Sequence, residues 1–282
     1  MGGSVGLRAR EAGLSVAGWD VDDANLRRAL DGGALSAVAG SFRELAAASD
    51  VLVLAAPLDA ILEQLGELAS LKRPPALTLD VASVKAPVAR AGRAVPGFVA
   101  THPIAGSERG GVAAARADLF ADKVWAYDAG AAPAAVELLE GFIAGMGALP
   151  LAIDPLEHDR IVALTSHLPQ LLSVALGRHL DPSLSSPAVS ALCGTGMASM
   201  LRLAASPWPM WRPILASNAE PVAQEVRELA AVLLGLAEAL ERGALGLVEC
   251  EFRAAAGAAA RLAANAADRG RVRDAGTDID ER

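Results

Sequence analysis

The chain has 282 residues, 53% of them hydrophobic and 21% charged, which is enough to bury a sizeable core in one large or two ordinary domains. A net charge of −8 and an isoelectric point near 5.1 argue against a basic, nucleic-acid-binding surface. Two cysteines are too few for a disulfide framework and fit a reducing cytoplasm.

No membrane-directing segment is recognisable. Arg8, Arg10 and Glu11 arrive before the apolar core of a signal peptide could form. The longest uncharged run, 182–201, contains two prolines, two glycines and many hydroxyls, so it is not predicted to span a membrane. We therefore expect a cytoplasmic protein with no membrane partner.

Strands and helices alternate through the first half of the chain. Strands are predicted at 14–20, 34–38, 50–57, 76–81, 98–102, 123–128 and 148–153. Helices are predicted at 22–30, 42–48, 58–68, 84–91 and 134–146. The run 50–57 is continuous, apolar and bounded by a proline, as a strand covered on both faces should be. This order predicts a parallel sheet with helices on both faces, a Rossmann-like domain over 1–153.

Several residues of this domain favour a dinucleotide. Gly2, Gly3 and Ser4 open the first helix, where backbone amides can face a pyrophosphate. Asp20 ends the next strand, where an acid accepts hydrogen bonds from ribose hydroxyls and repels a 2′-phosphate, so NAD is favoured over NADP. Alternatively, Asp20 caps the following helix. Ala55 and Pro57, at the end of another strand, are predicted cofactor contacts.

The glycine fingerprint is incomplete. A Gly-x-Gly-x-x-Gly motif should follow a strand, whereas this chain starts at what looks like its last glycine. The first strand is normally central, so without it two neighbouring strands lose their shared ladder. Either the start is misassigned or this polypeptide binds its cofactor poorly, and we favour a misassigned start.

After Asp154 the pattern changes to helices. They are predicted at 156–180, 188–204, 207–217, 219–243 and 246–267. The first is apolar around much of its circumference and must be buried on more than one side. We expect an all-α domain over 154–267 that covers its apolar surface by forming a homodimer. The charged, aperiodic tail at 268–282 is predicted to be disordered.

One histidine stands out in the stretch 101–111. His102 is fixed by Pro103 and follows the apolar run 98–100, which places it at the carboxyl end of a strand. Ligands bind at that edge in open α/β sheets, and histidine titrates nearest to neutral pH, so a general base is one interpretation. The other is a loop histidine that caps a backbone carbonyl, which His-Pro alone favours.

The residues Thr101-His-Pro-Ile-Ala-Gly-Ser-Glu108 resemble the signature of the prephenate/arogenate dehydrogenases of tyrosine biosynthesis. Further matches follow the same order along the chain: Gly2-Gly3-Ser4, Asp80-Val-Ala-Ser-Val-Lys85, His158-Asp159 with Ser166-His-Leu-Pro169, and Arg202 with 204–206 and Met210-Trp211. The resemblance implies an NAD-dependent oxidative decarboxylation without a metal. A hydride leaves C4 of a cyclohexadienol, the ring carboxylate leaves as carbon dioxide, and the ring becomes aromatic.

The resemblance also implies roles for residues of the first domain. His102 would hydrogen-bond and activate the 4-hydroxyl, and Ser83 would help to orient the hydroxyl and the histidine, although a helix cap is the alternative for Ser83. Ser107 and Glu108 would line the mouth of the pocket, with a solvated loop acid as the alternative for Glu108. Lys85 is interpreted as structural.

Substrate-binding residues are implied in the helical domain. Arg202 would clamp a carboxylate, although a lone helical arginine is often a surface group. His167 and Gln170 share one helix face and would contact substrate. Many family members carry a second histidine where Gln170 stands, and an uncharged amide there could mark arogenate use. Trp211 could line the pocket, although a tryptophan in a bundle is more often core.

Two other functions stay open. A two-domain dehydrogenase of the β-hydroxyacid or imine reductase type would want a catalytic lysine in the helical domain, whereas the last lysine is Lys123. A non-catalytic dimer that has lost cofactor binding is the other alternative.

Overall fold

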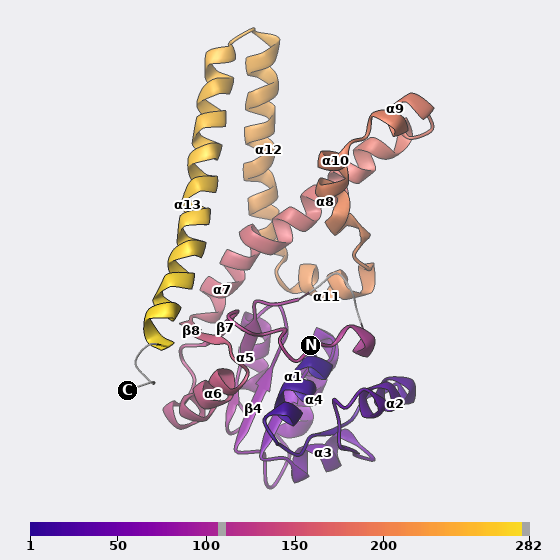
Figure 1. Ribbon diagram of the computed structural model, residues 1–282, viewed down its shortest axis with the longest axis vertical. Helices are drawn as coiled ribbons and strands as arrows, with labels where there is room; N and C mark the ends of the chain where they lie inside the picture. The colour runs from indigo at the N-terminus through magenta and orange to yellow at the C-terminus, as the bar shows by residue number, and fades with distance from the viewer. Residues whose placement is uncertain (107–110, 278–282) are drawn as a thin grey trace. The chain divides into compact units, whose positions relative to one another are not determined.

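The computed structural model describes residues 1–106 and 111–277 (Figure 1). By their contacts the residues form two compact units, Met1–Ala223 and Gln224 onward. The first unit holds all the described strands and the shorter helices. The second is a pair of long helices.

The described strands of the first unit form three ladders. β1 (Ala17–Gly18) pairs in parallel with β2 (Ala37–Val38). β4 (Leu77–Asp80) lies between β3 (Val51–Leu54) and β5 (Phe98–Val99), all parallel. β7 (Val124–Asp128) lies between β6 (Thr101–Pro103), which is antiparallel to it, and β8 (Leu149–Ile153), which is parallel. Among the described residues no ladder joins β1 to β3.

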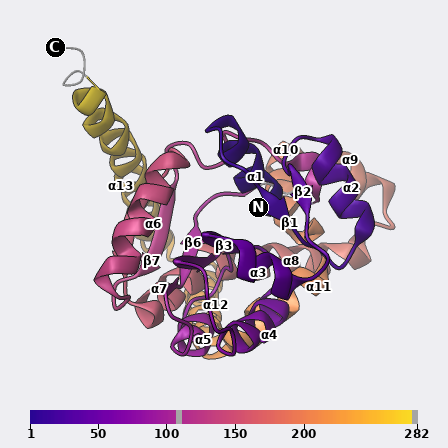
Figure 2. The ribbon, with the colours of Figure 1, turned by 90° about the horizontal axis from the view of Figure 1, so that it is seen from below.

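Helices cover both faces of these strands (Figure 2). They are α1 (Gly2–Glu11), α2 (Asp23–Asp31), α3 (Phe42–Ala48), α4 (Leu58–Leu68), α5 (Ala86–Gly92) and α6 (Pro133–Gly145), with a short 3₁₀ turn η1 (Val112–Ala114) before β7. Side chains begin two of them: Asp22 accepts from the backbone N–H of Ala24, and Ser41 accepts from that of Glu44. These caps satisfy N–H groups that a helix leaves unpaired at its start.

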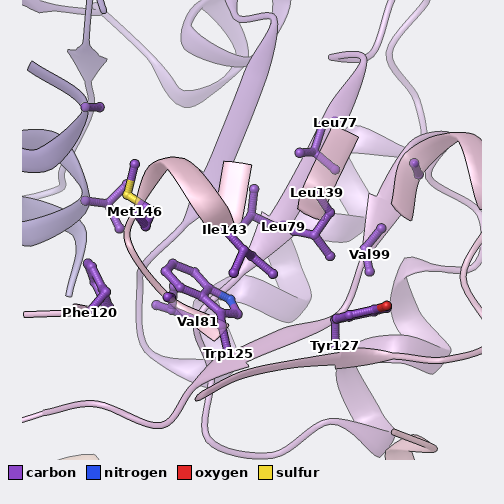
Figure 3. Packing of buried hydrophobic residues seen from close by; sticks show 14 residues of the cluster. Leu77, Leu79, Val81, Val99, Phe120, Trp125, Tyr127, Leu139, Ile143 and Met146 are labelled. Atoms are coloured by element: carbon purple, nitrogen blue, oxygen red, sulfur yellow. The ribbon is translucent and has the colours of Figure 1, made fainter. Parts of the chain in front are cut away.

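Two apolar clusters hold the α/β part together. On one face of β4, Leu77 and Leu79 pack with Leu139 and Ile143 of α6 and with Trp125, and all five are fully buried (Figure 3). The second cluster joins β3 to α3, α4 and α5 and includes Ile214 of α11. Burying each large aliphatic side chain contributes about 1.5–3 kcal/mol. All four residues of β4 are buried. The run 50–57, predicted to be a strand covered on both faces, forms β3, in which Leu52 and Leu54 are buried but Val51 is exposed, so one face of β3 is only partly covered.

The strand that leads into His102 differs from the prediction of one parallel strand over 98–102. β5 ends at Val99, and β6 turns away to pair antiparallel with β7, where His102 lies opposite Ala126. The cause lies in Asp80, whose carboxylate accepts the backbone N–H of Thr101 at 2.8 Å and whose carbonyl accepts the Thr101 hydroxyl. Since these contacts occupy the groups of Thr101, they end the parallel ladder there.

The helical segments of the first unit are α7 (Pro155–Val162), a π-helical turn η2 (Ala163–His167), α8 (Leu168–Leu180), η3 (Asp181–Ser183), α9 (Pro187–Leu192), α10 (Thr195–Leu201), η4 (Arg202–Ala205) and α11 (Trp208–Ser217). The helix predicted at 156–180 is therefore interrupted by a π turn, because Pro169 has no N–H and the Thr165 hydroxyl bonds to the Ile161 carbonyl. The helix predicted at 188–204 breaks at Cys193 and Gly194, which adopt extended backbone.

The second unit comprises most of α12 (Ala219–Glu241) and α13 (Leu245–Thr277), joined by a turn in which Gly243 adopts φ +65°, a conformation that favours glycine. Large apolar side chains such as Leu234 and Phe252 are exposed on it. α13 continues through 268–277, which the sequence places in a disordered tail, and 278–282 lie outside the described residues. Within the described parts of the chain, no helix combines the length and apolarity needed to cross a membrane.

Candidate active site

A buried polar cluster fixes the strand that carries His102. The Asp80 carboxylate forms an ion pair with Lys85, and both side chains are buried. Lys85 Nζ also donates to the Thr101 carbonyl at 2.6 Å, and Trp125 Nε1 donates to the Thr101 hydroxyl at 2.9 Å. Burial raises the pKa of Asp80 and lowers that of Lys85, while their attraction opposes both shifts. Lys85 therefore has the structural role that its sequence context suggests.

His102 projects from β6 into a chain of polar side chains. Its Nδ1 lies 2.9 Å from Nε2 of His158, and the two rings meet edge to face with centroids 5.1 Å apart. Burial lowers the pKa of His102 well below its usual 6.5, and the positive charge of Lys85 acts in the same direction. The imidazole is therefore neutral at neutral pH and able to accept a proton.

Asp159 connects this series of polar side chains to the start of α5 in the first domain. Its Oδ1 lies 2.8 Å from Nδ1 of His158 and accepts the backbone N–H of Lys85 at 2.6 Å. Its Oδ2 accepts the N–H of Ala86 at 2.8 Å. The first residues of α5 have no side-chain cap of their own, so Asp159 caps α5 from α7.

A second histidine lies on the other side of Asp159. Asn218 donates its amide to the Asp159 carbonyl at 2.7 Å and lies 3.2 Å from Nδ1 of His167. Since the amide nitrogen is the donor, His167 accepts at Nδ1 and carries its hydrogen on Nε2. Burial lowers the pKa of His167 to about 4.

Two buried donors at this place have no hydrogen-bond partner among the described residues. They are Nε2 of His167 and Nε1 of Trp211, and their rings meet edge to face with centroids 5.8 Å apart. Buried donors without a partner are costly, about 1–3 kcal/mol each. Each of these two groups therefore retains a hydrogen that it can donate to an oxygen acceptor.

Gln170 ties the same helix to the segment of Arg202. Its amide donates to the Leu203 carbonyl at 2.8 Å, and Ser173 accepts the N–H of Ala204 at 2.9 Å. Arg202 is exposed on η4 and adjoins this network through its neighbour Leu203. His102 and His167, both predicted from sequence, thus belong to one chain of polar contacts through His158, Asp159 and Asn218. Gln170, three residues after His167, makes a separate contact to the Arg202 segment.

Of the other residues predicted for the site in this domain, the structure describes Ser83 but not Ser107 or Glu108. Ser83 is half-buried between Asp80 and Lys85, just beyond β4. The alternative that Ser83 caps the following helix is not realised, because α5 starts after Lys85 without a side-chain cap bond. Ser107 and Glu108 lie outside the described residues.

The predicted cofactor residues lie at the start of α1 and at the ends of β1 and β3. Gly2 touches Ala55 so closely that a Cβ on Gly2 would lie 3.0 Å from that of Ala55. Asp20 Oδ1 accepts the N–H of Asp22 at 2.8 Å, so a local turn uses one of its two oxygens.

Ser4 is buried and turned inward. Its hydroxyl accepts the N–H of Arg116 at 3.1 Å, and its own N–H donates to the Met1 carbonyl. Gly2 and Gly3 therefore present the first amides of α1, and Pro57 precedes α4 at the end of β3. Small residues beside a helix start fit the close approach of a pyrophosphate.

Three residues of this network had no role from sequence alone, whereas Trp211 was already considered as a pocket residue. His158 and Asp159 form a conspicuous dipeptide within the family motif, so they had a signal without an assigned contact. Asn218 had none, because it simply ends α11. Only the packing of α7 on α5 and of α11 on α4 brings these groups together.

Residues 5–149 match the family described as "Prephenate dehydrogenase, nucleotide-binding domain", and residues 154–249 match "Prephenate dehydrogenase, dimerization domain". The chain is 31% identical over 232 residues to a prephenate dehydrogenase of Bacillus subtilis, covering 79% of this chain and 62% of that protein. It spans less than two thirds of the length of the curated relatives that it matches.

Solved structures of the same kind superpose on the chain. A prephenate dehydrogenase from Aquifex aeolicus, in complex with hydroxyphenyl propionate and NAD⁺, is 26% identical with a TM-score of 0.77, and the match covers 86% of this chain and 87% of that one. An arogenate dehydrogenase from Synechocystis is 22% identical with a TM-score of 0.72, covering 85% and 88%, and supports the fold alone.

Proposed function

Because the chain belongs to the prephenate dehydrogenase family, we propose that it catalyses the NAD-dependent oxidative decarboxylation of prephenate or arogenate. The observation that carries the proposal is His102, a neutral imidazole hydrogen-bonded through Nδ1 at the carboxyl edge of the β4 region, where ligands bind in α/β sheets. Its Nε2 is the nitrogen left to face a substrate hydroxyl.

His102 would accept the proton of the 4-hydroxyl as that oxygen becomes a carbonyl. NAD, when bound, would supply the acceptor for the hydride that leaves C4. The bond from the ring to its carboxylate breaks, carbon dioxide leaves, and the bonding electrons complete the aromatic ring. The 4-oxygen thereby becomes a phenolate, which takes the proton back from His102. Ser83, in the same turn as Lys85, would orient the hydroxyl. A positioned base of this kind contributes about 10²–10⁴ in rate.

The helical segments would hold the substrate. Arg202 matches the planar fork that binds a carboxylate, and His167 Nε2 and Trp211 Nε1 offer two buried donors to an oxygen acceptor. Since the amide N–H of Gln170 binds Leu203, its oxygen is the atom left to meet substrate, and an acceptor suits the ammonium of arogenate. Ser107 and Glu108 are proposed at the pocket mouth from the family motif.

NAD is the proposed cofactor. The amides of Gly2 and Gly3 would meet the pyrophosphate, the second carboxylate oxygen of Asp20 the ribose, and Ala55 and Pro57 the adjoining surface. The Aquifex aeolicus relative was solved with NAD⁺, which supports this choice. An acid at position 20 would repel a 2′-phosphate.

A homodimer in the cytoplasm completes the proposal. Residues 154–249 match a dimerization domain, and α12 and α13 expose large apolar side chains, among them Leu234 at 66% and Phe252 at 73%. A second copy would cover such surface. Cys193 and Cys250 are free thiols, which fits a reducing compartment.

A coupled product assay tests the function. The purified chain is incubated with NAD and either prephenate or arogenate, and NADH and carbon dioxide are both measured. We expect equal amounts of the two, with 4-hydroxyphenylpyruvate from prephenate or tyrosine from arogenate. A folded chain that binds NAD but yields neither product with either substrate would overturn the activity.

A second measurement separates the cofactor from the chemistry. Titration with NAD, followed by calorimetry, reports binding without turnover. A folded chain that does not bind NAD at millimolar concentration would support the alternative of a dimer impaired in cofactor binding, which the missing ladder between β1 and β3 makes worth testing. A clear preference for prephenate in the product assay would refute the arogenate role of Gln170.

A further inference from the structure

The two residues behind His102 decide which of its nitrogens can act. We propose that Asp159 and His158 are positioning residues that fix His102 as the tautomer with its hydrogen on Nδ1 and its lone pair on Nε2. The inference rests on the proposed function only for its catalytic consequence, because the tautomer can be observed without turnover.

Asp159 determines which ring nitrogen of His158 carries a hydrogen. Its Oδ1 accepts the backbone N–H of Lys85 at 2.6 Å, and Oδ2 accepts that of Ala86 at 2.8 Å, so the carboxylate serves as an acceptor on both oxygens. His158 Nδ1 lies 2.8 Å from Oδ1. A bare ring nitrogen at that distance would set two lone pairs against each other, so Nδ1 of His158 carries a hydrogen and donates it.

The tautomer of His158 in turn determines the tautomer of His102. A His158 ring that carries a single hydrogen, on Nδ1, has a lone pair on Nε2, and His102 Nδ1 lies 2.9 Å from that atom. His102 must therefore donate from Nδ1, which leaves Nε2 without a hydrogen. In the opposite arrangement Nε2 of His102 would carry the hydrogen and could not accept a proton from a hydroxyl.

Because His158 and Asp159 are buried, water does not compete for the hydrogen bonds that fix these ring hydrogens. His158 is 3% exposed and Asp159 4% exposed. Asp159 is held by backbone amides, and the main chain of the same residue accepts from Asn218, so α7 cannot rotate without losing these bonds. During reaction one proton moves from the substrate oxygen to Nε2 of His102, and the resulting positive charge is stabilised by the hydrogen bond to His158.

The experiment is nitrogen-15 NMR of the imidazole rings in the full chain at neutral pH. The chain has four histidines, so four ring systems appear and single substitutions assign them. We expect His102 to show a protonated Nδ1 and a bare Nε2. A wild-type protein in which Nε2 of His102 carries the hydrogen would overturn the inference, whether or not the protein proves to be a dehydrogenase.

Two variants of one position separate positioning from folding. His158→Leu removes the acceptor, so His102 should lose its single tautomer and kcat should fall about 10²–10⁴-fold with little change in KM. His158→Gln keeps an oxygen that can accept from Nδ1 and should recover much of the rate and the tautomer. His179→Gln, at an exposed position on α8, is the matched control and should change neither.

A purely structural role for His158 predicts a different pattern. His158→Leu and His158→Gln would then lose thermal stability alike, and the tautomer of His102 would be the same in both variants as in the wild type. That result would contradict the inference even if both variants lost activity. Absence of activity in a wild type with the expected tautomer would instead count against the proposed function alone.

Discussion

His167 should make the free energy of unfolding depend on pH. In acid the unfolded chain binds a proton at His167 more readily than the folded protein does, so the folded protein becomes less stable. Burial lowers the pKa of this residue to about 4 in the folded protein, whereas an unfolded histidine titrates near 6.5. Between these values the unfolded state binds a proton that the folded state does not, so stability is fully present above pH 6.5 and falls as pH drops through that value. From pH 6.5 to 5 the loss is about 2 kcal/mol at about 1.4 kcal/mol per pH unit.

The assay is urea unfolding of the wild type and of His167→Gln at pH 7.5 and pH 5.0, with His179→Gln as the exposed control. His179→Gln controls for the loss of an exposed histidine, so the difference between the two variants reports the buried position of His167, including its small effect on the pKa of His102. We expect His167→Gln to be less stable at pH 7.5 but to lose about 2 kcal/mol less than the wild type on going to pH 5.0. Equal losses in the wild type and His167→Gln would refute the reasoning.

Three further substitutions test other parts of the site. Lys85→Met leaves the buried Asp80 carboxylate without its partner and should cost about 3–5 kcal/mol in urea unfolding, while Lys72→Met, on the surface, should cost little; similar stabilities would contradict a structural Lys85. Arg202→Lys should raise KM for substrate about tenfold or more in steady-state assays, because a point charge does not replace a planar fork, and an unchanged KM would argue against the carboxylate clamp. Asp20→Asn should lower the preference for NAD over NADP about tenfold in kcat/KM, and an unaltered preference would remove Asp20 from the ribose.

The sequence predicted helix boundaries well where a neighbouring residue, such as a capping serine or a proline, sets them. The helices at 42–48 and 58–68 begin and end as predicted, because Ser41 caps the first and Pro57 precedes the second. The strand predicted at 76–81 contains β4. In each case the residues that set the boundary are neighbours in the chain.

Sequence failed where a distant side chain replaces a local rule. β6 leaves the parallel ladder because Asp80 takes the N–H of Thr101, 21 residues away, and nothing near Thr101 signals this. The break at Gly194 and the π turn before Pro169 are small departures in segments that otherwise read as helix. Each shifts the face on which later side chains lie.

In the candidate site, too, sequence motifs identified some residues but not their distant hydrogen-bond partners. His102, His167 and Gln170 could be chosen from motifs, because residue type and order carry their signal. The partners that set their hydrogen bonds could not: His158 reaches His102 across 56 residues, and Asn218 reaches His167 across 51. Distances and tautomers come only from the packed structure.

The pH dependence of kcat/KM tests the role of His102 most directly. Because burial lowers its pKa well below 6.5, the free enzyme should keep a neutral His102, and therefore its kcat/KM for prephenate or arogenate, to pH values well below 6.5 before activity falls. In His102→Asn the rate should be about 10²–10⁴-fold lower and this acid limb should be absent. An acid limb at or above pH 6.5, or the same limb in His102→Asn, would contradict the assignment of His102 as the base.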